Sequence, residues 1–372
     1  MRISTILSAS TAILAAAAVP AAAQLKYENA SGGSVLLYGQ VTPTIQSVND
    51  GESTTTSLVD NDHANTRVGA FVTQPYDAGQ FKFNFETALG APATSKVSQT
   101  FEPDWTWNRT NLRKIDFSFA ADWGTVYAGQ GSMATDGVAQ NDLSGTTLTT
   151  YIASSNDGYG DFEFRNADGT LSGVRIDSLN SDFDGTRKGR VRYDSPSVNG
   201  FGIRFAAGKE ILSKAPGASD DGFYDAALTY ANDFDTVEVQ GAVGYAQQQR
   251  KNASDVKDTF GSVSVLFQSG FNITLAAGSR QNGGQYTYGK LGYKANWFQV
   301  GSTAIGIDYY DGKDFNSTLV NDRYNAYGFG VTQTFTNVGM EGYFGYRRHN
   351  LKATGQDYQD IDGFLLGGRW KF

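Results

Sequence analysis

The chain has 372 residues and a net charge of −8, with 44 Gly, 20 Tyr and 24 Phe but only 7 Pro and no Cys. The lack of Cys excludes disulfides, a thiolate nucleophile and a Cys-based metal site. A mean hydropathy of −0.37 argues against helical membrane spans but suits alternating strands. The acidic balance, with no basic run, argues against a nucleic-acid partner.

The first residues have the pattern of a secretory signal peptide. Arg2 precedes an apolar stretch at 13–19 and a small-residue site at 21–23. The stretch is too short for a transmembrane helix. The sequence therefore predicts a signal peptide at 1–23, and a mature chain at 24–372 that is exported through the periplasm.

From residue 34 onward the sequence alternates with a period of two, as amphipathic strands do. Phe81, Phe83 and Phe85, for example, alternate with Lys82 and Asn84. Each such strand has one apolar and one polar face. Strands are predicted near 34–46, 64–74, 80–90, 111–121, 124–131, 188–195, 201–210, 222–232, 235–247, 258–269, 271–280, 285–295, 300–311, 323–335, 338–349 and 360–372.

The connections between these strands alternate between short turns and mostly longer polar segments. The longer segments are 47–63, 91–110, 132–187, 211–221, 248–257, 312–322 and 350–359, with a short exception near 281–284. Short turns on one rim and loops on the other are typical of a transmembrane β-barrel. A soluble β-sandwich is the alternative, but its long loops would not fall on every second connection. The predicted fold is all-β, an antiparallel transmembrane barrel of about sixteen strands.

The last predicted strand shows why the barrel must close. In hydrocarbon every backbone polar group needs an internal partner, so this strand must pair with the first. Phe364, Leu366, Trp370 and Phe372 share a face that suits lipid and the interfacial aromatic girdle, whereas Arg369 lies on the opposite, water-filled side.

Several short motifs resemble the general bacterial (Gram-negative) porin family, and within it the porins of Rhodobacter-like α-proteobacteria. Their order and spacing cover nearly the whole mature chain. The matching pieces are Leu37-Tyr38-Gly39-Gln40, Thr66-Arg67-Val68-Gly69, Phe81 to Leu89, Trp123 to Gly129, Tyr193-Asp194-Ser195-Pro196, Gly200-Phe201 and the final Phe372.

The resemblance implies a homotrimer of barrels in the Gram-negative outer membrane, each with a long third loop folded into its lumen as a constriction. It implies passive diffusion of small hydrophilic solutes and ions. Membrane lipids, lipopolysaccharide and the outer-membrane assembly machinery are the other expected partners, with Phe372 as a signal for assembly.

The segment 132–187 is much longer than ordinary connections, and such loops are usually functional or disordered. It is also acidic, which predicts one charged face of a constriction; a solvated surface loop is the alternative. The candidate acidic residues are Asp136, Asp142, Asp157, Asp161 and Glu163.

Basic residues on the wall opposite such a loop would create a transverse field that filters solutes by charge. Lys188, Arg190 and Arg192 share one face of the strand after the loop, and Arg204 is expected to face inward on the next. A basic side chain facing lipid at mid-membrane would cost about 2–4 kcal/mol, so alternation assigns these residues to the lumen.

Correspondence to the family adds Arg67 and Arg113 to the basic set. Arg67 fits the alternation of its strand, but Arg113 shares a face with apolar residues. Either Lys114 supplies the charge there, or a bulge near Asn111 shifts the register.

Three further possibilities carry less support. Asp182 and Asp184 resemble the start of a calcium loop but lack its completing Glu, so no metal or cofactor is expected beyond this weak candidate. An enzyme would need a general base, and only His63 and His349 are present without an accompanying catalytic motif. A channel selective for sugars or anions remains the alternative to general diffusion.

Overall fold

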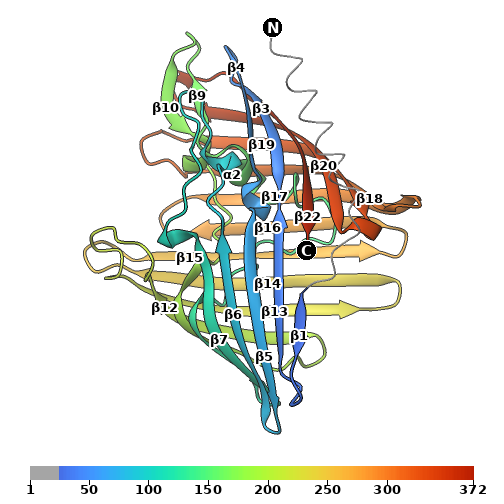
Figure 1. Cartoon of the computed structure of the whole chain (residues 1–372). Coiled ribbons are helices and arrows are strands. Elements are labelled where there is room, and N and C mark those ends of the chain that lie inside the picture. The colour runs from blue at the N-terminus through green and yellow to red at the C-terminus, as the bar shows by residue number, and fades with distance from the viewer. Residues whose placement is uncertain (1–24) are drawn as a thin grey trace.

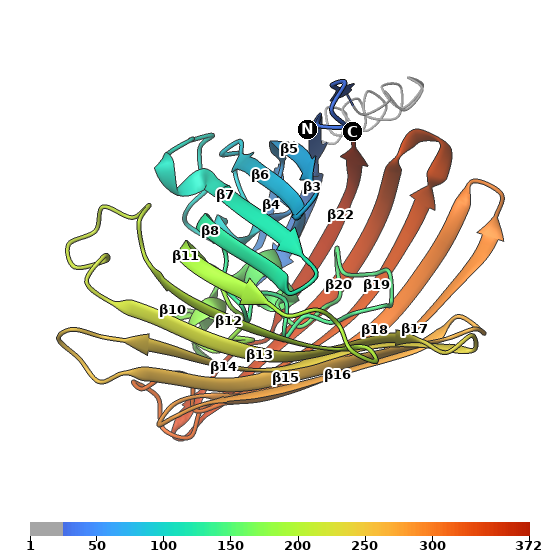
Figure 2. The same ribbon diagram turned by 90° about the horizontal axis from the view of Figure 1, so that it is seen from below.

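The computed structural model describes residues 25–372, so the predicted signal peptide lies outside the described residues. Sixteen antiparallel strands form a closed barrel, and both ends of the described chain lie close together on one edge (Figures 1 and 2). Within residues 25–372, no helix has the length and apolar character needed to cross a membrane.

The first two barrel strands are each interrupted. β2 (Ser34–Val41) continues into β3 (Pro43–Asn49), and β4 (Thr54–Asp60) continues through a 3-10 turn, η2 (Asp62–Ala64), into β5 (Arg67–Tyr76). The other fourteen strands are β6 (Gly79–Ala88), β7 (Leu112–Ala121), β8 (Gly124–Ser132), β11 (Arg187–Asp194), β12 (Phe201–Lys209), β13 (Gly222–Asp233), β14 (Val237–Gln249), β15 (Val256–Phe267), β16 (Phe271–Arg280), β17 (Gln285–Phe298), β18 (Gly301–Lys313), β19 (Arg323–Phe335), β20 (Met340–Ala353) and β22 (Ile361–Lys371).

The remaining elements are short. Two strands, β1 (Lys26–Glu28) and β21 (Gln356–Asp357), extend hairpins, and β9 (Glu163–Arg165) pairs with β10 (Leu171–Arg175). The helical turns are α2 (Ser154–Tyr159), η3 (Thr94–Lys96), η4 (Arg109–Asn111), η5 (Ile176–Ser178) and η6 (Thr336–Val338).

The last strand closes the barrel, as the sequence predicts. β22 pairs with β20 on one side and with β2 and β3 on the other. Phe364 and Leu366 are exposed on the outer surface, whereas Leu365 is 4% exposed on the inner one. The Phe372 ring lies over Gly39, where any side chain would collide with it.

One predicted loop is wrong. The segment 47–63 was expected to be a long connection, but β3 and β4 pair through most of it and leave only a four-residue turn at 50–53. The run of Thr and Ser in this segment lacks apolar alternation, yet Thr is a favourable strand residue. The other connections alternate in length as predicted.

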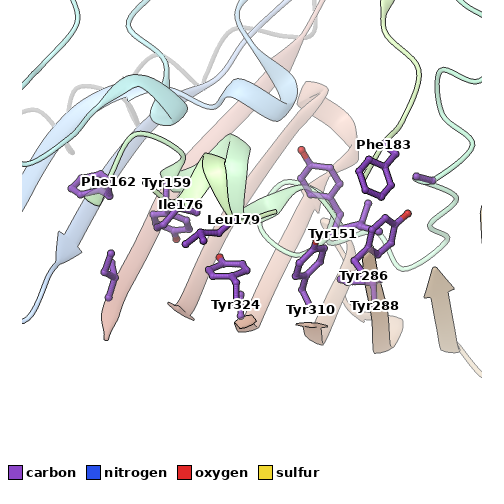
Figure 3. Close-up of a cluster of buried hydrophobic side chains, with 14 of the residues drawn as sticks. Tyr151, Tyr159, Phe162, Ile176, Leu179, Phe183, Tyr286, Tyr288, Tyr310 and Tyr324 are labelled. Carbon is purple, nitrogen blue, oxygen red and sulfur yellow. The ribbon is translucent and has the colours of Figure 1, made fainter. Parts of the chain in front are cut away.

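The third loop, residues 133–186, folds into the barrel lumen (Figure 2). It contains α2, η5 and the β9–β10 hairpin, so it is a small folded unit and not an extended strap. Its apolar side chains Phe162, Phe164, Ile176 and Leu179 have no exposed surface. They pack against inward-facing side chains of the barrel wall (Figure 3).

Glycines on the wall let the third loop approach closely. A Cβ atom at Gly345 of β20 would lie 2.7 Å from Cβ of Thr149, closer than real Cβ atoms come to a neighbour. Gly330 on the adjacent β19 faces the same threonine. The loop is therefore seated directly on the backbone of this wall, which leaves the open lumen on the opposite side.

Candidate functional site: the charged constriction

Two arginines of β11 fix the point where the chain leaves β8 and enters the third loop. Arg190 donates hydrogen bonds to the carbonyl of Ser132 (3.0 Å) and to the Asp116 carboxylate (2.6 Å), and its side chain is only 2% exposed. Arg192 donates to the carbonyl of Met133 (2.8 Å) and to Asp194 (2.7 and 2.8 Å). Both face inward as predicted, but Arg190 is part of the wall and does not present its charge to the pore.

The structure resolves the register of Arg113 in favour of a bulge. Glu86 pairs with Lys114 and Thr87 pairs with Leu112, so Arg113 is the extra residue between them. The bulge turns Arg113 inward, where its Nε lies 2.6 Å from Glu86 Oε1.

Arg67 reaches the same carboxylate as Arg113. Its Nε lies 3.5 Å from Glu86 Oε2. The Glu86 side chain is 7% exposed, and the Tyr38 hydroxyl also donates to it (3.0 Å). Two guanidinium groups therefore share one carboxylate, which leaves an excess of positive charge on this part of the wall.

Arg187, at the first position of β11, completes the positive side. It interacts electrostatically with Asp136, Asp62 and Glu86. Within residues 25–372, no carboxylate oxygen lies within 4 Å of it, so its charge is not bound in a contact pair and acts on these surrounding groups of the constriction. We call Arg67, Arg113, Arg187, Arg192 and Arg204 the basic wall.

The carboxylates that face the basic wall come from two segments. Asp136 of the third loop interacts electrostatically with Arg187, Arg192 and Arg204. Asp157 lies on α2, and Asp62 lies on η2 and accepts a hydrogen bond from the Ser95 hydroxyl. We call Asp62, Asp136 and Asp157 the acidic face.

Asp157 sits among several charged groups. Its Oδ2 lies 3.7 Å from His63 Nδ1, and its side chain is 30% exposed. Its enclosed position, followed by the nearby negative charges of Asp62 and Asp182, raises the pKa of the Asp157 carboxyl well above its usual range. This carboxyl consequently stays protonated to a higher pH than an ordinary Asp.

The other predicted acidic residues do not belong to the acidic face. Asp142 forms a buried ion pair with Lys290 of β17 (2.8 Å), and both side chains are almost fully buried. Asp161 and Glu163 lie near Arg175 (3.7 and 4.0 Å), so both belong to the hairpin region of the third loop. The sequence showed that the loop is acidic but not which of its carboxylates meet the pore.

Two predicted basic residues lie beside the site. Lys188 is paired with Glu210 of the next loop at 2.9 Å. Lys114 is opposite Glu86 in the register of β6 and β7. Arg204 of β12 differs from both, because its side chain is 33% exposed and its nearest carboxylate, Asp194, is 3.9 Å away.

Asp182 and Asp184, the weak calcium candidate, are used within the loop. Asp184 accepts hydrogen bonds from the backbone N–H groups of Gly137 (2.5 Å) and Ala139 (2.7 Å). Asp182 accepts from the Gln140 side chain at 2.7 Å. Among residues 25–372, no three His, Asp or Glu side chains are grouped so that they could hold a metal ion.

Opposite the basic wall, a file of aromatic residues supports the third loop. Tyr286, Tyr310 and Tyr324 come from β17, β18 and β19, with ring centroids 5.6 and 6.0 Å apart, and none is more than 3% exposed. Tyr310 donates a hydrogen bond to the Ser181 carbonyl (2.9 Å). The loop covers this file, so the tyrosines form a packing platform and not a surface along which a solute could slide (Figure 3).

Sequence reasoning missed several members of the site. Glu86 follows Lys82 and Asn84 on the polar face of the predicted strand 80–90, and that inward position is the available signal. Asp62 and His63 were placed in a loop because the η2 interruption inside a strand gives no periodic signal. Arg187 is the last residue of the predicted loop 132–187, outside the strand alternation that assigns the other basic residues.

Comparisons with known proteins are consistent with this architecture. The family profile described as Gram-negative porin matches residues 9–360. No curated protein sequence matches the chain. An anion-selective porin from Comamonas acidovorans has a similar structure, with a TM-score of 0.61, 15% identity, and coverage of 91% of this chain and 100% of that one.

Two further solved structures have the same fold. Salmonella typhi OmpF in complex with daunomycin has a TM-score of 0.58 at 12% identity, and the match covers 94% of this chain and 100% of that one. The trimer form of Vibrio cholerae OmpT has a TM-score of 0.54 at 16% identity, and the match covers 91% of this chain and 99% of that one. At these identities the likeness shows the fold alone.

Proposed function

The chain belongs to the Gram-negative porin family, and we propose that the charges on its constriction determine which solutes pass most readily. It forms a channel in the outer membrane for the passive diffusion of small hydrophilic solutes and ions. The narrower resemblance to Rhodobacter-like porins stays a prediction.

The opposed charges of the basic wall and the acidic face carry this proposal. Arg187 and Arg204 keep charges that are not bound in close pairs, while Asp136 of the third loop interacts electrostatically with both. Opposite charges across a narrow aqueous passage produce a transverse field that orients dipolar solutes. Together with Glu86 and Asp194 of the wall itself, the three carboxylates of the acidic face match the five arginines of the basic wall in number. We therefore expect general diffusion with weak ion selectivity.

Anion selectivity is the second candidate. One observation favours it: Arg67 and Arg113 share the single carboxylate of Glu86. The structurally similar porin from Comamonas acidovorans is itself anion-selective. A sugar-specific channel has less support, because Tyr286, Tyr310 and Tyr324 are covered by the third loop.

We propose a role in transport and not in catalysis. His349 has no exposed surface, and its Nδ1 is hydrogen-bonded to the Tyr324 hydroxyl at 2.6 Å. The ring of His63 packs against Tyr151 with centroids 4.0 Å apart. His349 is therefore closed off from a substrate in the lumen, and the ring of His63 is held between Tyr151 and Asp157. We propose equally that the channel works without a cofactor.

Export and assembly are also proposals. The signal-like pattern at 1–23 supports export through the periplasm before the barrel at 24–372 inserts. The trimer form of the Vibrio cholerae structure supports a homotrimer. Contact of Phe372 with Gly39 at the closing seam supports a part for this residue in recognition by the assembly machinery. Lipopolysaccharide is the expected lipid neighbour of the outer surface.

Planar-bilayer recording of the purified protein tests the proposed function. We expect stepwise conductance increases in groups of three and a reversal potential close to zero in a salt gradient. A gel should show an oligomer that heating converts to a monomer. Barrels that insert but stay silent would contradict transport, and a strong anion preference would favour the second candidate.

A further inference from the structure

A hollow of about 400 Å³ lies between the third loop and the inner face of β12–β14. Gly137 and Asn141 of the loop line one side, and Arg204, Thr229 and Gln240 line the other. Ser195 and Ser197 of the short turn between β11 and β12 also line it. The hollow therefore lies on the short-turn side of the constriction and is large enough for a small solute.

Arg204 supplies this hollow with a positive charge that has no close partner. Its Nε lies 3.9 Å from Asp194 Oδ2, beyond hydrogen-bond distance. Both oxygens of Asp194 already accept hydrogen bonds from Arg192. Among residues 25–372 the Arg204 guanidinium donates no hydrogen bond, and its side chain keeps 33% exposure. The three groups together carry one net positive charge.

The neighbours of Arg204 limit the charge of a suitable ligand. Asp136 interacts electrostatically with Arg204 from the direction of the constriction. Glu238 lies two residues from Gln240 and accepts a hydrogen bond from its amide (3.0 Å). These carboxylates would repel a polyanion, whereas a single carboxylate can approach the fork of donors on Arg204.

The other polar groups of the hollow suit hydroxyls. The Gln240 amide nitrogen is used by Glu238, so its Oε1 is free to accept. Thr229 Oγ1 donates to the Gly202 carbonyl (3.3 Å) and can likewise accept. A solute that presents hydroxyl donors beside a carboxylate therefore matches the lining better than an apolar acid does.

We propose that this hollow is a binding station for small hydroxylated monocarboxylates, held by Arg204, Thr229 and Gln240 on the short-turn side of the pore. The inference rests on the proposed function and deepens it, because a station beside the constriction raises the local concentration of one solute class. It makes the channel kinetically asymmetric: a monocarboxylate that enters from the short-turn side meets the station before the constriction.

The test compares gluconate with glucose, which has a similar size and hydroxyl pattern but no charge. In single-channel recordings, gluconate should reduce or add noise to the current with a half-saturating concentration about tenfold lower than that of glucose. Its association rate should be higher when it is added on the short-turn side. Arg204→Gln should remove both differences.

Lys209→Gln is the matched control. Lys209 is on the same strand and loses the same charge, but its side chain is exposed, and its odd-numbered position lies on the outer face of β12. This variant should retain the preference for gluconate. Equal effects of gluconate and glucose on the native channel, or an unchanged preference in an Arg204→Gln channel that still conducts, would overturn the station alone. Loss of conductance in the native protein would instead contradict the proposed function.

Discussion

The two sides of the lumen use inward-facing charges in different ways. On the β17–β20 side, Lys290 and Arg347 are at most 2% exposed and form buried pairs with Asp142 and Asp308. On the β5–β12 side, Arg67 and Arg204 are 22% and 33% exposed. Strand alternation directs all of these side chains inward. The charges under the third loop are sealed, whereas most of those away from it meet water; Arg190 is an exception, because the wall itself seals it.

This difference separates charges that stabilise the fold from charges that influence which ions pass. Where the loop packs on the wall, a charge is removed from water and needs a fixed partner, so it contributes to a rigid seat. Where the loop stands away, a charge stays hydrated and can act on passing ions. Substitutions on the two sides should therefore have different effects: on stability on one side, and on permeation on the other.

The largest expected effect is a loss of stability on the β17–β20 side, which we call the sealed side because the third loop covers its charges; the β5–β12 side is the open side. Asp308 accepts from Arg347 Nη2 with both oxygens (2.8 and 2.6 Å) and from the Tyr288 hydroxyl (3.1 Å). Asp308→Asn leaves a buried guanidinium without its anion, so we expect a loss of about 3 kcal/mol in the free energy of unfolding. Denaturant unfolding of the purified barrel, followed by Trp fluorescence, measures it.

The control for Asp308→Asn is Asp311→Asn on the same strand. Asp311 pairs with Arg323 (2.8 Å), but that arginine is 57% exposed on the outer surface. Its loss should cost at most about 1 kcal/mol. Equal destabilisation by both substitutions would show that the buried pair under the third loop contributes no more to stability than an exposed pair.

An intermediate effect is expected on the open side, where Arg187 meets the lumen. Arg187→Gln removes one unit charge close to the path of the ions, an interaction of about 1 kcal/mol in water. We expect the permeability ratio to shift roughly two- to fivefold toward cations, less so at high salt. Reversal potentials in a salt gradient measure the shift.

Two further channels show whether the shift belongs to the pore. Arg250→Gln changes an exposed residue in the loop between β14 and β15 and should leave the reversal potential unchanged. Arg190→Gln should mainly destabilise the barrel, because Arg190 is fixed in the wall. An unchanged reversal potential in Arg187→Gln would remove this residue from the basic wall.

Much of the barrel could be predicted from alternation, because lipid on one face and water on the other impose a period of two. The sixteen strands, the alternating turns and the inward direction of Arg190, Arg192 and Arg204 follow from this rule. The error at 47–63 arose where a strand extends with polar residues on both faces. Where both faces of a strand carry polar residues, there is no contrast between a lipid-facing and a water-facing side, and the periodic signal disappears.

The site was harder to predict because its charges are sorted by tertiary contacts. Arg190 and Arg204 satisfy the same alternation, yet one is sealed against Asp116 and the other is open. Tyr286 and Tyr310 lie side by side because of the register between two neighbouring strands, which the sequence pattern does not reveal. The third loop itself has no period, so its own core and its choice of wall depend on packing that a sequence pattern does not encode.

The smallest expected effect is a pH dependence of selectivity that arises from Asp157. Because its enclosed position in the lumen raises the pKa of this carboxyl, Asp157 gains its charge at a higher pH than an ordinary Asp does. Added negative charge on the acidic face should increase the cation permeability ratio with rising pH. Asp157→Asn should reduce that increase, as reversal potentials across a pH series would show.

Other carboxyls in the third loop determine how completely the pH response disappears. Burial also raises the pKa of Asp182 and Asp184, so the Asp157→Asn channel should keep a smaller response. Asp161→Asn is the matched control, because Asp161 belongs to the same loop but lies near Lys96 and Arg175, which offset its charge. The Asp161→Asn channel should show the same change of reversal potential with pH as the native channel. If Asp161→Asn and Asp157→Asn alter the response equally, the loop's charge acts as a whole, and the division into a sealed and an open side does not extend to the loop itself.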